Sequence, residues 1–134
     1  MNFVVGTGDH LAVELSKTLK TKRIVKLDMS NRDIGDRGAA ALAESFHVNN
    51  VLDDLDLSGN AIGDFGAKQI ARALRSNPSI KYLDLSRNKI GKKGAFELME
   101  AFEKNSVLKR LHLSDNKYVS MLGIPTNISV DLIK

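Results

Sequence analysis

The sequence predicts a single α/β domain in which short strands and helices alternate and stack as a solenoid. The first observation behind this prediction is a motif that returns every 28 residues, with first residues Ile24, Leu52, Ile80 and Leu108. The second is a change within each unit from alternate apolar residues, which indicate a strand, to apolar residues at helical spacing. A unit of this size cannot bury its apolar face alone, so neighbouring units must stack.

The first expected element is a helix that belongs to an incomplete unit. Thr7-Gly8-Asp9 matches Ile34-Gly35-Asp36, and Leu15 and Leu19 then predict a helix over residues 9–20. Residues 1–6 would be a cap or the remainder of a lost strand.

Four short strands are expected next, one in each of the segments 24–30, 52–58, 80–86 and 108–114. In the second segment Leu55 and Leu57 alternate with Asp54, Asp56 and Ser58, which is the two-residue period of a strand. If the units stack, one core leucine of each strand lies beside the next in adjacent strands of the same direction. These leucines are Leu27, Leu55, Leu83 and Leu111.

A helix is expected after each of the first three strands. In the second unit Phe65, Ile70 and Leu74 lie among basic residues at the spacing of an amphipathic helix. Asp36 and Asp64 are predicted N-caps, because a carboxylate accepts hydrogen bonds from the free amides of a helix start. The glycine before each helix is expected to have a positive φ. These glycines are Gly35, Gly63 and Gly91.

The C-terminal segment departs from the repeat, because Asn116 is not followed by the Gly-x-x-Gly-Ala of the other units. Ile128, Val130 and Leu132 alternate with polar residues and predict a last short strand. The single domain 1–134 then divides into an N-terminal half-repeat or cap (1–23), full repeats (24–51, 52–79 and 80–107) and a partial repeat with a C-terminal cap (108–134). The alternative is a fragment of a longer array.

Composition excludes several classes of function. The 134 residues contain no cysteine, which excludes disulfides, thiolate metal sites and cysteine nucleophiles. The glycine motifs lack the Gly-Lys-Ser/Thr ending of a phosphate loop, and no serine, histidine and acid form a nucleophile pattern. We therefore expect no enzyme activity, no cofactor, no metal and no small-molecule substrate. No apolar run is long enough to span a membrane, and no signal peptide opens the chain, so an intracellular, cytoplasmic protein is expected.

The repeat itself resembles a known family. The pattern L-x-x-L-x-L-x-x-N-x-I-G-x-x-G-A is similar to the leucine-rich repeat of the ribonuclease-inhibitor type, whose units have about 28 residues. The resemblance implies a right-handed α/β horseshoe with a parallel sheet on the concave face and α-helices on the convex face. It also implies that the chain binds another protein.

Two residues depart from the family pattern. The first unit has Arg32 where the others have asparagine, and arginine has no acceptor for the turn amides. This turn is expected to be looser, or to use Asn31 instead. Lys92 stands where Asp36 and Asp64 stand in their units, which places a positive charge at the positive end of a helix dipole.

The strand residues that flank the core leucines point to the concave surface, because successive side chains of a strand alternate in direction. We call the surface that eight of them form the concave face, and we predict that it binds protein. Its residues are Lys26, Asp28, Asp54, Asp56, Tyr82, Asp84, Arg110 and His112. Stacking would place Asp28, Asp56, Asp84 and His112 in one row, with about 4.8 Å between neighbours.

This row has a functional and a structural interpretation. In the functional interpretation the row is an acidic surface that binds a basic partner. In the structural interpretation its aspartates only form hydrogen bonds with groups of the adjacent strands. We expect at least one carboxylate pKa in the row to rise, because like charges lie close together. Tyr82 is either an interface anchor or a residue packed beside Asp54 or Arg110.

Residues 65–96 are strongly basic, with eight lysines and arginines and one aspartate. An acidic or phosphate-bearing partner is one interpretation, but no aromatic platform for nucleic acid accompanies the charge, and a solvated rim is preferred. Phe65 is expected to tuck against its loop, with an exposed apolar contact as the alternative. The acidic last helix could meet this basic region of a second copy, so a monomer or weak self-association is expected.

The sequence therefore predicts a non-catalytic module that binds a protein partner of unknown identity, with no membrane and no nucleic acid. One alternative is a regulator of a small GTPase, since the Ran GTPase-activating protein is similar to this repeat type. The other is a scaffold or cytoskeletal component whose charged ends matter more than its concave face.

Overall fold

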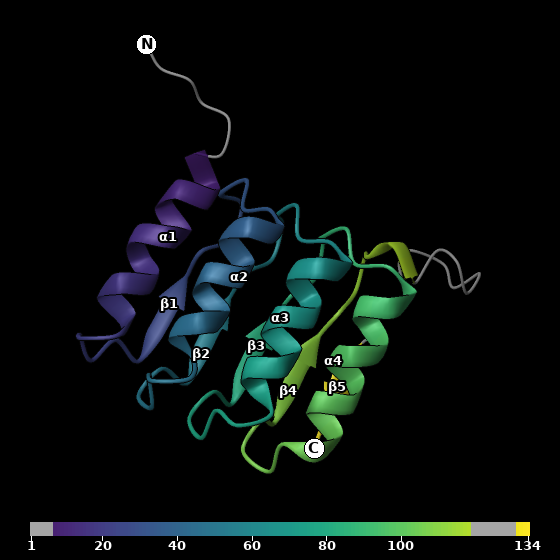
Figure 1. Cartoon of the computed structure of the whole chain (residues 1–134). Coiled ribbons are helices and arrows are strands. Elements are labelled where there is room, and N and C mark those ends of the chain that lie inside the picture. The colour runs from purple at the N-terminus through teal and green to yellow at the C-terminus, as the bar shows by residue number, and fades with distance from the viewer. Residues whose placement is uncertain (1–6, 119–130) are drawn as a thin grey trace.

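A computed structural model describes residues 7–118 and 131–134 and confirms the α/β solenoid. In Figure 1 the strands run up behind the helices, the helices run down in front, and successive units move to the right, so the solenoid is right-handed. The helices are α1 (Thr7–Leu19), α2 (Asp36–Ser45), α3 (Asp64–Leu74) and α4 (Lys92–Lys104). The strands are β1 (Lys26–Asp28), β2 (Asp54–Asp56), β3 (Tyr82–Asp84), β4 (Arg110–His112) and β5 (Asp131–Ile133).

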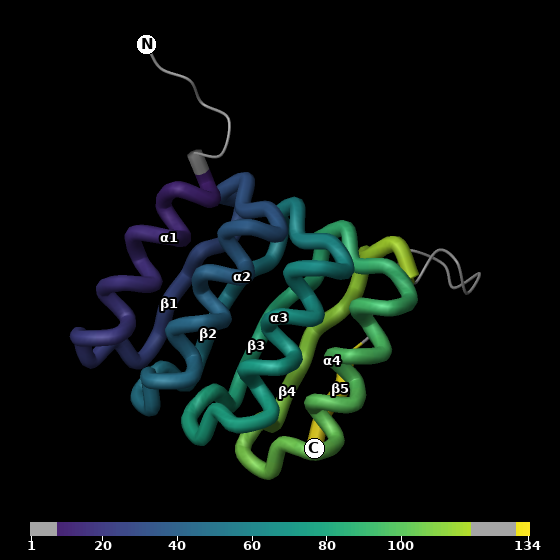
Figure 2. The backbone as a smooth tube through the Cα atoms, in the orientation of Figure 1, coloured from purple at the N-terminus to yellow at the C-terminus, as the bar shows by residue number. Residues whose placement is uncertain are grey.

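The sheet has the order β1-β2-β3-β4-β5, and its first four strands are parallel. Leu27 pairs with Leu55, Leu55 with Leu83 and Leu83 with Leu111, as predicted. Figure 2 shows the sheet and the helices as two layers of the backbone tube. The core lies between them and contains Leu55, Leu83, Leu111 and the buried apolar residues of the helices, with Leu27 partly buried against it.

The last strand differs from the others in direction. β5 is antiparallel to β4, with Leu132 opposite Leu111, so the outer edge of β4 is already paired. The predicted strand residues Ile128 and Val130 lie outside the described residues, as does the proposed cap 1–6.

The predicted role of Asp36 and Asp64 as caps of their own helices is wrong. The N-caps are Gly35, Gly63 and Gly91, with no side-chain cap. Each aspartate instead caps the next helix along the array: Asp36 Oδ1 accepts from the Gly63 N–H at 2.7 Å and the Gly66 N–H at 3.0 Å. Asp9 and Asp64 make the same pair of bonds to Gly35 and Gly38, and to Gly91 and Gly94.

This inter-repeat cap explains the departure at Lys92. An aspartate there would be placed to cap a Gly-x-x-Gly in the following unit, and the sequence after β4 contains none. At the other end of α4 the side chain of Lys134 acts as a cap, because its Nζ donates hydrogen bonds to the carbonyls of Phe102 and Asn105. A cation at the C-terminus of a helix is also favoured by the helix dipole.

The prediction of positive φ at Gly35, Gly63 and Gly91 is also wrong, because their φ values are −102°, −105° and −94°. The left-handed position of the unit comes earlier, directly before the turn asparagine. It is occupied by Gly59, Arg87 and Asp115, and by Asn31 before Arg32 in the first unit, with φ between 55° and 69°. In that unit Asp33 also has a positive φ, of 57°.

The turn asparagines connect neighbouring repeats, which explains the departure at Arg32. Asn60 Oδ1 accepts from the N–H groups of Arg32 and Ile34, both at 2.9 Å, so the first turn takes its acceptor from the second unit. Within the described residues no strand precedes β1, so no earlier turn needs an asparagine at position 32. Asn31 does not replace it: its Oδ1 faces the Arg87 guanidinium at 3.4 Å.

Candidate functional site

The alternation of each strand gives the concave face its side chains. Leu55, Leu83 and Leu111 are fully buried, while the residues on either side of each leucine reach solvent. Three residues in a strand are enough for this, since the parallel register then repeats the same pattern across four strands.

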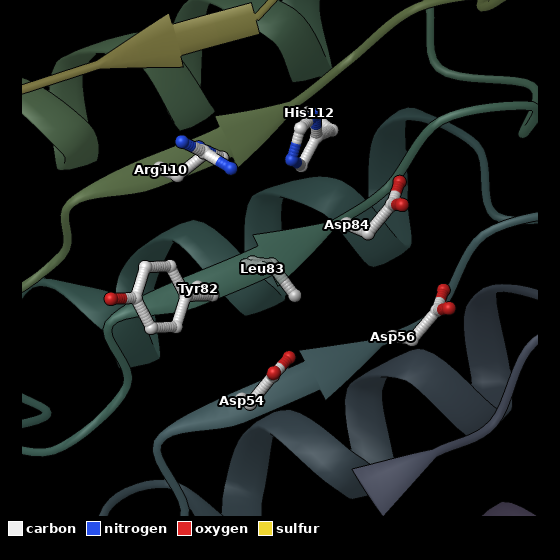
Figure 3. Close-up of a pocket in the computed structure, with 7 residues that line it drawn as sticks. All are labelled: Asp54, Asp56, Tyr82, Leu83, Asp84, Arg110 and His112. Carbon is white, nitrogen blue, oxygen red and sulfur yellow. The ribbon is translucent and has the colours of Figure 1, made fainter. Parts of the chain in front are cut away.

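The register arranges the eight predicted residues as two rows across the sheet. One row is mixed in charge and holds the only aromatic residue of the face: Lys26, Asp54, Tyr82 and Arg110. The other row is acidic and ends in an imidazole: Asp28, Asp56, Asp84 and His112. Figure 3 shows Tyr82 on β3 between Asp54 of β2 and Arg110 of β4.

Two adjacent hollows lie over these rows. The larger, of about 340 Å³, is lined by Leu83 and by six of the predicted residues (Figure 3). These six are Asp54, Asp56, Tyr82, Asp84, Arg110 and His112. The second, of about 330 Å³, is lined by Lys26, Leu27, Asp28, Asp54 and Asp56. The face is therefore a continuous, charged surface that reaches from β1 to β4.

Each aspartate of the acidic row is held by the serine two residues later. Oδ1 of Asp28, Asp56 and Asp84 accepts the serine hydroxyl at 2.6 Å and the serine N–H at 2.9 Å. At Asp28 these bonds lower the carboxyl pKa, the Ser30 hydroxyl most and the Ser30 N–H next. The rise expected for at least one carboxylate of this row does not occur at Asp28, because hydrogen bonding to the charged form outweighs the desolvation that raises its pKa.

We expect Ser30→Ala to raise the pKa of Asp28 toward its ordinary value, because the stronger of the two donors is lost. A group whose folded pKa is lowered favours the folded chain above its ordinary pKa, and this contribution fades as the pH falls through the folded pKa. Carboxyl ¹³C NMR over an acid titration measures the change. Ser76→Ala, at an exposed serine on another surface, is the control, and an unchanged Asp28 titration in Ser30→Ala would contradict the hydroxyl as the cause.

The fourth member of the acidic row is paired with the last strand. His112 Nδ1 lies 2.8 Å from Asp131 Oδ1, and the two residues face each other across the antiparallel pair β4–β5. Sequence reasoning did not include Asp131 in the site. The alternation around Leu132 indicated a strand, but its antiparallel direction places Asp131 beside His112.

Tyr82 lies in the middle of the mixed row. Its side chain lies in register between Asp54 and Arg110, and it remains 43% exposed. An aromatic ring that is held by neighbours and still exposed has little rotational entropy to lose when a partner covers it.

The basic region 65–96 is spread over several elements, and all eight of its lysines and arginines are exposed. Its Arg75 pairs with the acidic side of α4, at 3.4 Å from Glu97 and 2.5 Å from Glu100. Arg75 and the glutamates of α4 are among the charges that would attract a second copy of the chain, and here they form ion pairs within one molecule.

The described residues include no group of three histidine, aspartate or glutamate side chains arranged to hold a metal ion. Over the same ranges, no helix has the length and apolarity that crossing a membrane requires.

Comparison with known proteins places these features in context. The sequence matches the Leucine Rich repeat family over residues 24–43, 48–71 and 76–99, about half of the chain. The structure is similar to leiomodin-1 actin-binding site 2, with a TM-score of 0.73 and 23% identity over 81% of this chain and 62% of that one. It is also similar to the tropomodulin C-terminal domain from Caenorhabditis elegans, with a TM-score of 0.68 and 13% identity over 81% of this chain and 65% of that one. The chain thus spans less than two thirds of either structure, and no curated protein matches its sequence.

Proposed function

Because the chain belongs to the leucine-rich repeat family, we propose that it is a non-catalytic module that binds a protein partner through its concave face. The observation that carries this proposal is the two adjacent hollows, which all eight concave-face residues line. Six of the eight side chains stand on β2, β3 and β4, whose register is set by a paired strand on each side, so little conformational entropy is lost when these side chains bind a partner.

The chemistry of the face favours a partner with a basic segment and an apolar group. The row of Asp28, Asp56 and Asp84 offers carboxylates at the spacing of adjacent strands, and the hollow beside it offers the exposed ring of Tyr82. Arg110 and Lys26 lie at opposite ends of the mixed row, so an acidic group at either end of the partner would also be matched.

Actin is the partner to test first, because the matching part of leiomodin-1 is that protein's actin-binding site 2. At this level of identity the likeness supports a shared fold, and actin binding by the present chain is part of the proposal. It also favours the cytoskeletal alternative over the regulation of a small GTPase.

We expect the double variant Tyr82→Ala/Asp84→Ala to bind its partner about tenfold more weakly or worse, since an exposed aromatic anchor and its neighbouring charge are lost together. Tyr82 is exposed, but Asp84 is half-buried and accepts two hydrogen bonds from Ser86, so the free energy of unfolding should fall by about 1–3 kcal/mol and the variant should stay folded. Biolayer interferometry with monomeric actin, and with proteins recovered by affinity purification, measures the loss.

The control for this experiment is Arg37→Ala, which removes an exposed charge from α2 on the other side of the sheet. If the double variant binds every partner as well as the unmodified chain, the concave face is not the site. Association through the charged ends of a scaffold would then be the better account.

A further inference from the structure

The convex side of the molecule carries a hollow that the proposed function does not use. It lies between the outer surfaces of α3 and α4 and has a volume of about 410 Å³. We call it the α3–α4 hollow. It is lined by Asp64, Phe65, Lys68, Lys93, Phe96 and Glu97. Phe65 is 57% exposed and Phe96 is 61% exposed, so the expectation that Phe65 tucks against its loop is wrong.

The repeat places the two phenylalanines diagonally across this hollow. α3 and α4 are related by the 28-residue period, so position 65 lies beside position 93, and position 68 beside position 96. Phe65 therefore neighbours Lys93, and Phe96 neighbours Lys68. Each helix contributes one aromatic ring and one ammonium group, one turn apart.

The fold does not require aromatic residues at these positions. In α2 the equivalent positions hold Arg37 and Ala40, and α2 packs in the same layer between α1 and α3. Scattered exposed apolar residues are ordinary on a protein surface, but two large rings that line one hollow form a patch. The rings of Phe65 and Phe96 are thus available to a partner without loss to the core.

The carboxylates of the hollow have partners within the molecule, whereas its two lysines form no ion pair with the described residues. The carboxylate of Asp64 is engaged by the N–H groups of Gly91 and Gly94, at 2.7 and 2.9 Å. Glu97 is paired with Arg75 at 3.4 Å. Lys68 and Lys93, by contrast, form no ion pair with any residue in the described ranges. The exposed Arg72, Lys89 and Lys92 lie within four residues of them in the sequence and add further positive charge to this part of the chain.

From the two exposed rings and the unpaired lysines we propose that the α3–α4 hollow is a second docking site, which takes an acidic segment of another protein with a large apolar side chain as its anchor. The anchor sits between Phe65 and Phe96, and flanking carboxylates meet Lys68 and Lys93. The apolar contact supplies affinity and the lysines supply orientation and a salt-dependent attraction. This site lies on the opposite side of the sheet from the concave face, so the two can be occupied independently.

Selection from a phage library of random peptides of about 12 residues tests the proposal. The full chain serves as bait, and the double variant Phe65→Ala/Phe96→Ala is used to remove peptides that bind elsewhere. We expect the enriched peptides to be net negative and to contain at least one large apolar residue. A synthetic copy of the most enriched peptide should bind about tenfold more weakly to the double variant in fluorescence anisotropy.

Charge reversal provides a second variant that keeps both rings. Lys68→Glu/Lys93→Glu should also weaken the synthetic peptide by about tenfold, and raising NaCl from about 0.05 M to about 0.5 M should weaken it on the unmodified chain. Tyr82→Ala/Asp84→Ala should bind it normally, which separates this proposal from the function of the concave face. All four substitutions in the hollow are at exposed side chains, and thermal unfolding followed by circular dichroism verifies that each variant is folded.

Several outcomes would overturn the proposal. One is a set of enriched peptides that are basic or lack large apolar residues, and another is the absence of any peptide that distinguishes the chain from Phe65→Ala/Phe96→Ala. A dimer in sedimentation velocity that this variant converts to a monomer would assign the hollow to a second copy instead. Binding of a single-stranded RNA of about 12 nucleotides with the same dependence on both variants would assign it to nucleic acid.

Discussion

Asn60→Ala is expected to lower the free energy of unfolding by about 3–5 kcal/mol, because one buried amide serves two repeats. The side chain of Asn60 accepts from two N–H groups of the preceding turn, those of Arg32 and Ile34. It also donates to the carbonyls of Met29 and Leu57, both at 2.9 Å. Alanine leaves these groups buried without partners, and each unsatisfied group is destabilising by about 1–3 kcal/mol, offset in part by water entering the space.

Urea unfolding followed by circular dichroism measures the change. Asn50→Ala is the matched control, because Asn50 is exposed and its side chain makes no hydrogen bond with the described residues. The control should differ from the unmodified chain by no more than about 0.5 kcal/mol. A similar small effect for Asn60→Ala would mean that the asparagine does not join the first two repeats.

Gly66→Ala is expected to lower the free energy of unfolding by about 2–3 kcal/mol, although alanine is the better helix former. A Cβ at this position would lie 2.8 Å from Asp36 Oδ1, 2.9 Å from Ile62 Cγ2 and 3.0 Å from Ala39 Cβ. The new methyl group would push α2 away from α3 and would stretch the hydrogen bond from the Gly66 N–H to Asp36. Loss of packing and loss of the inter-repeat cap then act in the same direction.

Gly63→Ala is the control for this prediction, because it adds the same methyl group three residues earlier. Its Cβ would lie 3.4 and 3.5 Å from the Asp36 carboxylate oxygens, and its φ of −105° suits alanine. A change of no more than about 0.5 kcal/mol is expected, since alanine also restricts the unfolded chain. Stabilisation by Gly66→Ala would show that helix propensity outweighs the contact between the repeats.

The acidic row and the α3–α4 hollow show which features of the surface the sequence could predict and which it could not. Alternation along each strand predicted which side chains leave the core, since this depends only on the geometry of neighbouring residues. The lowered pKa of Asp28 does not follow from alternation, because it depends on how the Ser30 hydroxyl and N–H are placed in the folded turn. The α3–α4 hollow was missed because Phe65 and Phe96 are 31 residues apart and become neighbours only when the helices stack.

By itself, the sequence determined the repeat, the order of strand and helix, the parallel register of the leucines and the membership of the concave face. All of these follow from apolar periodicity, which is a property of residues close together in the chain. Only the tertiary structure decided which atoms of neighbouring repeats meet. It assigned Asp36 to the helix after its own, Asn60 to the turn before its own, Asp131 to His112, and Lys134 to the end of α4. A free amide or carbonyl can take any suitable partner, and the partner it finds is set by the stacking of the units.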